Sequence, residues 1–158
     1  MRRRDTPKFI YDAQMEMVEV LASANDSKEF VDKIPQALDV VCKYRQWLLN
    51  GEIPVWDLVV TKHLSKDPKR YKQKVSQVIA AQQLIDEGAR ISAGQNLRFV
   101  YTSAENKRYE RRVKAEELIE ENTVFDVKKY LKLLYVAATN LLSPFGYSPK
   151  SIQGYILL

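Results

Sequence analysis

The spacing of apolar residues changes from helical near both ends of this chain to alternating in its middle. Across 126–142, apolar side chains recur every three or four residues, which predicts an amphipathic helix with Asp126 as its cap. Similar spacing predicts a helix after Pro7 and a second helical stretch that Pro35 kinks or splits before Gly51 ends it. The two ends of the 158-residue chain are therefore expected to be helical.

The middle of the sequence predicts a small β element. Residues 55–61 suit a short strand because branched apolar side chains predominate. Residues 96–115 look like a hairpin with its turn near 104–106, because Leu97, Phe99 and Tyr101 alternate with the residues between and after them. A helix between them starts near Val75 and ends at Gly88. The patterns predict an α+β fold that is mainly helical, with a small β-hairpin element. We expect a single domain over 1–158, made of a helical N-terminal part (1–51), a strand, basic loop, helix and hairpin (52–125), and a C-terminal helix and tail (126–158).

The positive charge of the chain is concentrated in residues 61–74, which we call the basic segment. It holds six lysines or arginines and one acidic residue, a formal charge of +5 that equals the net charge of the whole chain. Hydroxyl groups lie among the cations, where a predicted strand leads into a predicted helix, and this mixture suits phosphate oxygens. A solvated charged loop is the alternative. The candidate nucleic-acid-binding residues of the segment are Thr61, Lys62, Ser65, Lys66, Lys69, Arg70, Tyr71, Lys72 and Lys74.

Two arginines near the N-terminus, Arg3 and Arg4, are further candidates for the same surface. The alternative for these two residues is a flexible basic end. A second run of cations at 107–114 is diluted by glutamates, so we interpret it first as a mixed surface.

The sequence offers no recognisable catalytic or metal-binding set. His63 is the only histidine and Cys42 the only cysteine, so neither a histidine-based metal cluster nor an intramolecular disulfide can be built. There is no phosphate-binding glycine loop and no zinc-ligand spacing, which favours a binding part over a self-sufficient enzyme. No apolar run approaches the length of a membrane span and no secretion signal is recognised, so we expect a cytoplasmic location without a membrane partner.

Four segments carry a resemblance to a known family: RRRDTPKFIYDAQMEMVEVL, DLVVTKHLSKDPKRYK, VIAAQQLIDEGARISAGQNLRFVY and NLLSPFGY. Their order and spacing resemble the C-terminal thumb of family B DNA polymerases of the archaeal type, over nearly the whole chain. The resemblance implies a helical thumb that grips the primer–template duplex behind the active site during DNA replication. It implies backbone contacts by Thr61, Lys62, Ser65 and Lys66, while Tyr71 and Lys72 match the next part of the pattern and Arg3 and Arg4 match the start of the thumb.

The resemblance also implies what this chain does not carry. The metal-binding aspartates of the family belong to the palm, and their motif is absent from this sequence. No cofactor is therefore expected on this chain, and Mg²⁺ is expected on the palm. The resemblance implies that polymerisation, the nucleotidyltransferase reaction of the family, would need a separate polymerase chain carrying palm and fingers. The initial methionine fits either the small chain of a split polymerase or an excised domain.

The sequence departs from the family in two places. Ser76 and Gln77 stand where many members have Pro-His before a helix, which puts a contact by that histidine in doubt. Gln153 and Ile156 match the start of the sliding-clamp peptide of the family, but the aromatic residues that should follow are absent. A sliding clamp is therefore only a secondary candidate partner.

Two other function classes fit the residues. A stand-alone module for RNA or single strands would stack bases on Tyr71, Tyr101 and Tyr109. A helical adaptor would bind another protein and use its charge only for solubility.

Overall fold

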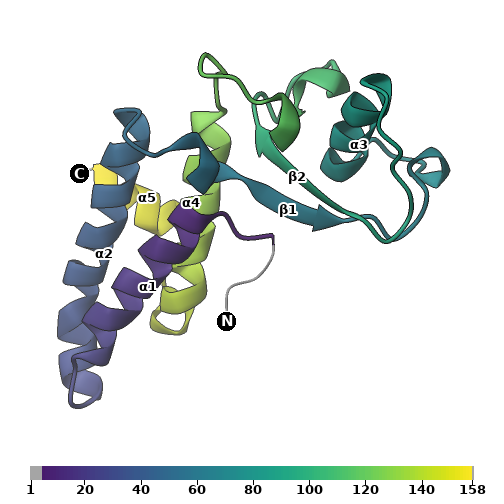
Figure 1. Ribbon diagram of the computed structural model, residues 1–158. Coiled ribbons are helices and arrows are strands. Elements are labelled where there is room, and N and C mark those ends of the chain that lie inside the picture. The colour runs from purple at the N-terminus through teal and green to yellow at the C-terminus, as the bar shows by residue number, and fades with distance from the viewer. Residues whose placement is uncertain (1–4, 158) are drawn as a thin grey trace. The chain divides into compact units, whose positions relative to one another are not determined.

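The computed structural model describes residues 5–157, which form two compact units (Figure 1). The sheet unit comprises the described residues up to Pro7 together with Val55–Lys129, and the helical unit comprises Lys8–Pro54 and the chain from Tyr130 onward. The chain passes between the two units after residues 7, 54 and 129. That both units act as one domain stays a prediction. Arg3 and Arg4 lie outside the described residues.

The described chain confirms the α+β, mainly helical class. It contains the helices α1 (Lys8–Ala22), α2 (Ser27–Leu49), α3 (Ser76–Asp86), α4 (Val127–Leu142) and α5 (Pro149–Leu157). Its strands are β1 (Val60–His63), β2 (Asn96–Tyr101) and β3 (Val113–Ala115), joined in one antiparallel sheet with β2 at the centre.

In the helical unit, α1 and α2 lie side by side and are joined by a short turn (Figure 1). Apolar residues at helical spacing on α1 are buried, with Phe9, Ala13 and Met17 each about 1% exposed, whereas Val20 is half-buried. The Phe9 ring meets the Tyr130 ring of α4 edge to face, with 5.9 Å between the centroids. The expected C-terminal tail folds as α5, because Ile152 finds a fully buried position.

Of the two effects that the sequence offered for Pro35, a kink or a split of the second helical stretch, the split does not occur. α2 runs without interruption through Pro35, and Asp26 caps its start by accepting a hydrogen bond of 2.8 Å from the Glu29 backbone N–H. The carbonyl that loses its partner to the proline belongs to Val31, which is 52% exposed and open to water. Gly51 ends the helix as expected, with a φ of +71°.

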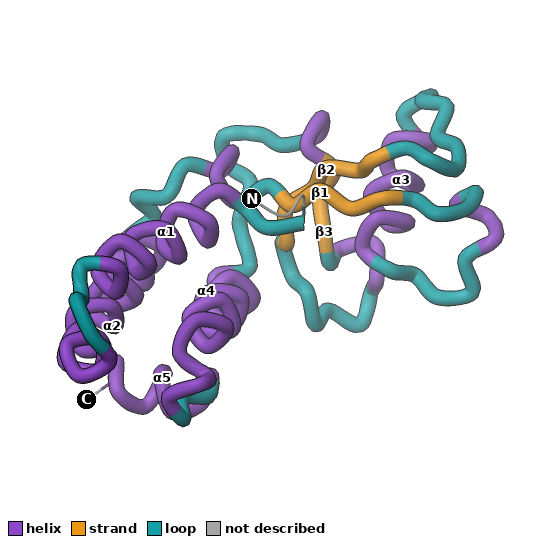
Figure 2. The backbone as a smooth tube through the Cα atoms, turned by 90° about the horizontal axis from the view of Figure 1, so that it is seen from below, coloured by secondary structure: helices purple, strands orange, loops and turns teal. Residues whose placement is uncertain are grey.

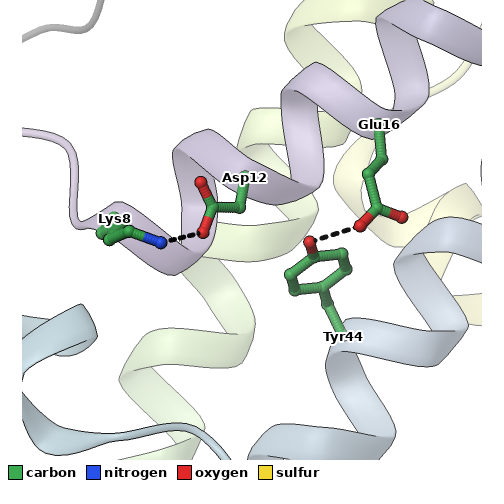
Figure 3. A network of polar contacts seen from close by, with 4 residues as sticks. All are labelled: Lys8, Asp12, Glu16 and Tyr44. Atoms are coloured by element: carbon green, nitrogen blue, oxygen red, sulfur yellow. Dashed lines mark hydrogen bonds and ion pairs between the residues drawn. The ribbon is translucent and has the colours of Figure 1, made fainter.

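A polar network joins α1 to α2 through the Glu16 carboxylate. This group accepts hydrogen bonds from the Tyr44 hydroxyl at 2.7 Å (Figure 3) and from the Lys43 ammonium. Burial raises the pKa of Glu16, but the hydrogen bonds from Lys43 and Tyr44 and the charge of Lys43 outweigh it, so the pKa lies below its ordinary value of 4.5. A carboxyl group with a lowered pKa stabilises the fold above its unfolded pKa, and this contribution is lost as the pH falls through the folded pKa.

We expect Tyr44→Phe to lower the free energy of unfolding by about 1 kcal/mol at pH 7, because Glu16 loses one hydrogen bond. The difference from the unsubstituted protein should shrink as the pH falls through the lowered pKa of Glu16, because the carboxylate that accepts the hydrogen bond is then lost. Denaturant titrations over a series of pH values from 7 downward measure this. Tyr155→Phe, at an exposed tyrosine of α5, is the matched control and should have no effect. Equal stability of Tyr44→Phe and the unsubstituted protein at pH 7 would contradict the assignment.

In the sheet unit, β2 pairs with both other strands, and α3 packs on β2 and β3 (Figure 2). The predicted hairpin is confirmed by the pairs Phe99 with Ala115 and Tyr101 with Val113. The strand expected from Val55 begins instead at Val60, because Val55–Leu58 forms a 3₁₀ turn that buries Leu58 completely. The pairing of β1 with β2 was not part of the sequence-based prediction.

The outer edge of β3 is closed by the side-chain amide of Gln83 on α3. Its Oε1 accepts a hydrogen bond from the Ala115 backbone N–H, and its Nε2 donates to the Val113 carbonyl, each at 2.8 Å. One side chain thus takes the place of a neighbouring strand at an edge that otherwise leaves backbone groups unpaired.

We expect Gln83→Ala to lower the free energy of unfolding of the sheet unit by about 1–3 kcal/mol, because two half-buried backbone groups lose their partners. Gln82→Ala is the matched control: its side chain is exposed and bonds only to Asp86, so about 0.5 kcal/mol or less is expected. Denaturant titration and hydrogen exchange at the Ala115 amide measure both variants. Similar losses of unfolding free energy in Gln83→Ala and Gln82→Ala would show that the Gln83 contacts with β3 do not stabilise the sheet unit.

Candidate nucleic-acid interface

The basic segment begins in β1 and continues as a loop whose first residue, Leu64, is anchored in the sheet unit. Leu64 is completely buried, its backbone N–H donates to the Gln95 carbonyl at 2.9 Å, and its carbonyl accepts from Gly94 at 2.8 Å. Pro68 is also buried and begins a 3₁₀ turn over Pro68–Arg70. These apolar anchors hold the loop between β1 and α3 while the charged side chains between them stay at the surface.

Ser65 and Tyr71 close the loop by bonding to each other. The Tyr71 hydroxyl accepts a hydrogen bond of 3.0 Å from the Ser65 backbone N–H and lies 3.1 Å from Ser65 Oγ. The hydrogen bonds from Ser65, together with the charge of Lys66, lower the pKa of Tyr71. The Lys66 ammonium lies 4.9 Å from the centre of the Tyr71 ring. Two of the hydroxyl groups that the sequence offered as phosphate donors, those of Ser65 and Tyr71, therefore also shape the loop.

The positive charge of the basic segment is not neutralised by ion pairs within the described chain. Its only acid, Asp67, accepts a hydrogen bond of 2.9 Å from the Lys69 backbone N–H and so caps the 3₁₀ turn. No carboxylate of residues 5–157 forms an ion pair with a lysine or arginine of the segment. The exposed cations of the segment are Lys66, Lys69, Arg70, Lys72 and Lys74, and Lys62 is half-buried.

Thr61 and Lys62 are separated by the geometry of β1. They are consecutive residues of a strand, so their side chains point to opposite faces of the sheet. His63 shares the face of Thr61 and its Nδ1 lies 3.1 Å from Asn96 Oδ1. The side chain of Thr61, a predicted contact residue, therefore lies on the opposite face of the sheet from the side chain of Lys62.

Lys62 and Lys74 line a cleft of about 380 Å³ at the start of α3, together with two cations that the sequence did not group with them, Arg112 and Lys129. Ser76 and Gln77 contribute the first turn of α3 to the same cleft. The remaining lining residues are Val75, Ile79, Tyr101 and Ala104, so no acidic side chain lines the cleft.

Arg112 and Lys129 reach the cleft through tertiary contacts. The predicted cap Asp126 accepts a hydrogen bond of 3.0 Å from the Lys129 backbone N–H, and its own N–H donates to the Tyr101 carbonyl at 2.9 Å, which ties the start of α4 to the end of β2. Arg112 Nε donates to the Asn106 carbonyl at 2.7 Å. The cap itself was predicted correctly, but a one-dimensional pattern does not say which loop it meets.

Other kinds of site find little support in the described residues. Residues 5–157 contain no group of three or more His, Cys, Asp or Glu side chains that could hold a metal ion. Cys42 is half-buried, and burial, with the nearby Asp39 charge, raises the pKa of its thiol. None of the described helices is both long and apolar enough to cross a membrane. Gln153 is exposed on α5 and Ile156 half-buried, and clamp binding stays a prediction.

The tyrosines proposed for base stacking differ in availability. Tyr101 is only 7% exposed and has the Lys129 ammonium 5.0 Å from its ring centre, so stacking of a base on Tyr101 is excluded. Tyr109 is 42% exposed, with the Lys74 ammonium 5.6 Å from its ring centre.

Comparison with known proteins points in one direction. The family described as DNA polymerase family B matches residues 1–145. A DNA polymerase of Thermococcus sp. (strain 9oN-7) is 22% identical over 152 residues, and DNA polymerase 2 of Aeropyrum pernix is 24% identical over 153 residues; each alignment covers 96% of this chain. The chain spans only 19% and 18% of the length of these relatives. The family B DNA polymerase of Pyrobaculum calidifontis has a similar fold, with a TM-score of 0.75 and 21% identity over 91% of this chain and 18% of that one.

Proposed function

This chain belongs to DNA polymerase family B, and from that premise we propose that it is the thumb part that grips the primer–template duplex. The observation that carries the proposal is the basic segment: five cations on an anchored loop and a sixth on β1, without ion pairs to carboxylates of the described chain. Duplex DNA presents closely spaced phosphates, and a protein that neutralises them gains affinity by releasing bound counterions.

The chemistry of the segment suits the DNA backbone rather than the bases. Lysine ammonium groups act as point charges on phosphate oxygens, and Arg70 adds a planar, bidentate donor. Contacts of this kind fix the position of a protein on DNA and carry little sequence information. A polymerase part that must hold any primer–template needs this property, so we expect binding that depends on salt and hardly on base sequence.

In this proposal, nucleotide addition requires a second chain or region that carries the palm, the fingers and the Mg²⁺ ions. The palm motif is absent from this sequence, and the chain spans only 19% and 18% of the length of its relatives. A primer-extension assay with this chain alone, Mg²⁺ and all four nucleotides tests it. No extension is expected, and incorporation by the purified chain would overturn this part of the proposal.

The class of nucleic acid is tested by competition. A labelled primer–template duplex bound to this chain is challenged with unlabelled duplex, with each single strand, and with an RNA of the same sequence. The proposal predicts that the DNA duplex competes best. Preference for single strands or RNA would instead favour a stand-alone module, which the structure now limits to Tyr71 and Tyr109 as stacking residues.

The helical-adaptor alternative has its own discriminating variant. If nucleic-acid binding is unaffected by Lys66→Ala combined with Lys69→Ala, the charge of the segment serves solubility and the adaptor class gains support. The proposed function predicts weaker duplex binding by this double variant, because both side chains are exposed and free of carboxylate partners within the described residues.

A further inference from the structure

We propose that the cleft at the start of α3 seats one phosphate group of the nucleic-acid backbone, with Lys62, Lys74, Arg112 and Lys129 as its cationic ligands. This inference rests on the proposed function and adds to it a specific phosphate-binding site next to the exposed loop. Two of the four residues, Arg112 and Lys129, lie outside the basic segment.

The charge of the cleft is one-sided. Four cations line it, no carboxylate does, and within residues 5–157 none of the four forms an ion pair. Asp126, three positions before Lys129, has both carboxylate oxygens engaged: Oδ2 accepts from the Ala104 N–H at 2.7 Å and Oδ1 from the Lys129 N–H at 3.0 Å. Like charges brought together in a cleft raise the local concentration of anions.

Backbone donors face the same place. α3 has eleven residues, and its N-cap residue, Val75, makes no side-chain hydrogen bond to the helix. Ser76 and Gln77, as its first two residues, have no intrahelical acceptor for their N–H groups, and no other described residue accepts from them. Both residues line the cleft, so the cations and the positive end of a helix dipole act on one anion.

Three of the four cationic side chains already have a contact within the protein before any ligand arrives. The Lys129 ammonium lies over the Tyr101 ring at 5.0 Å and the Lys74 ammonium over the Tyr109 ring at 5.6 Å. Arg112 Nε is bonded to the Asn106 carbonyl at 2.7 Å, which leaves the terminal guanidinium nitrogens for an anion. Side chains that are already ordered lose less conformational entropy when they bind.

The chain offers a closely matched control for the test. Arg111 and Lys128 are the sequence neighbours of Arg112 and Lys129, carry the same charges, are exposed and do not line the cleft. We therefore compare Arg112→Gln plus Lys129→Gln with Arg111→Gln plus Lys128→Gln. Both pairs remove two positive charges, so long-range effects on DNA binding should be alike, and only the first pair removes the seat.

Anisotropy titration of a primer–template duplex at several salt concentrations measures both pairs. The cleft pair should weaken binding about tenfold at 0.1 M salt and reduce the slope of log K against log salt by about 1, the value for one phosphate contact. The control pair should weaken binding by about twofold or less, as expected of charges away from a contact. Equal losses in the two pairs would overturn the cleft assignment and leave the proposed function standing.

Amide NMR separates a backbone phosphate from a free one. The Ser76 and Gln77 amide signals are followed while the protein is titrated with the duplex and, separately, with inorganic phosphate. Shifts at much lower concentrations of duplex phosphate, absent in the cleft pair, are the expected result. A response to inorganic phosphate with no duplex binding would overturn both the backbone assignment and the proposed function. Duplex binding that leaves these two amides unmoved would overturn the cleft alone.

Discussion

Replacing Lys66, Lys69, Arg70 and Lys72 together with glutamine is expected to weaken binding to a primer–template duplex by about 10²- to 10³-fold at 0.1 M salt. Each exposed cation that meets a phosphate contributes close to one unit of the salt slope, so the slope should also fall by about 3 to 4. The loop should keep its shape, because its anchors Leu64 and Pro68 and the Ser65–Tyr71 closure are untouched.

The control for this variant removes the same charge elsewhere. Lys28, Arg90, Lys128 and Lys150 are exposed and lie outside the basic segment and the cleft. Their combined replacement by glutamine should cost less than about tenfold in duplex affinity, since only general attraction is lost. Circular dichroism checks that both quadruple variants are folded. If both weaken binding to the same degree, net charge alone explains the affinity and the segment is not a contact surface.

The largest effect on stability is expected from Phe99→Ala. Phe99 is completely buried on the central strand, and its ring meets Tyr101 edge to face with 5.6 Å between centroids. Deleting the ring should lower the free energy of unfolding of the sheet unit by about 3–5 kcal/mol, because a cavity is left behind. Denaturant titration followed by residue-resolved hydrogen exchange measures the loss in the sheet unit separately from the helical unit.

Phe145→Ala deletes the same atoms at a position that is 42% exposed and is the control for Phe99→Ala. The Phe145 ring stacks on Phe30 at 4.7 Å, so a loss of only about 1 kcal/mol is expected, confined to the helical unit. A loss for Phe99→Ala that is no larger than for Phe145→Ala would contradict the assignment of β2 as the core of the sheet unit.

Local signals along the chain predicted the elements that depend on neighbours in sequence. Gly51 and Gly88 end helices with φ values of +71° and +96°, as a helix-terminating glycine does, and Asp126 caps α4. The pairing of β1 with β2 joins Val60 to Phe99, thirty-nine positions apart, and no periodicity encodes such a partner. The sequence also did not predict the 3₁₀ turn at Val55–Leu58, because a buried apolar residue such as Leu58 is equally typical of a strand.

The candidate site also has a part that the sequence predicted and a part that only the fold brings together. The cations of the basic segment are adjacent in sequence, so their concentration was visible in the composition of one short stretch. Arg112 was hidden in a stretch with many glutamates, and Lys129 in the first turn of a helix. Both join Lys62 and Lys74 only because the hairpin and the Asp126 contacts bring them there. That arrangement required the folded chain.

The measurement that tests the central claim most directly is fluorescence anisotropy of a labelled primer–template duplex titrated with the unsubstituted chain at 50 and 200 mM salt, with the single strand as control. If about five phosphates are neutralised, duplex affinity should fall about 10²- to 10³-fold between the two salt concentrations and should exceed single-strand affinity at both. Duplex binding that is absent at 50 mM salt, or that does not change with salt, would contradict the account of a chain that grips the DNA backbone through its basic segment.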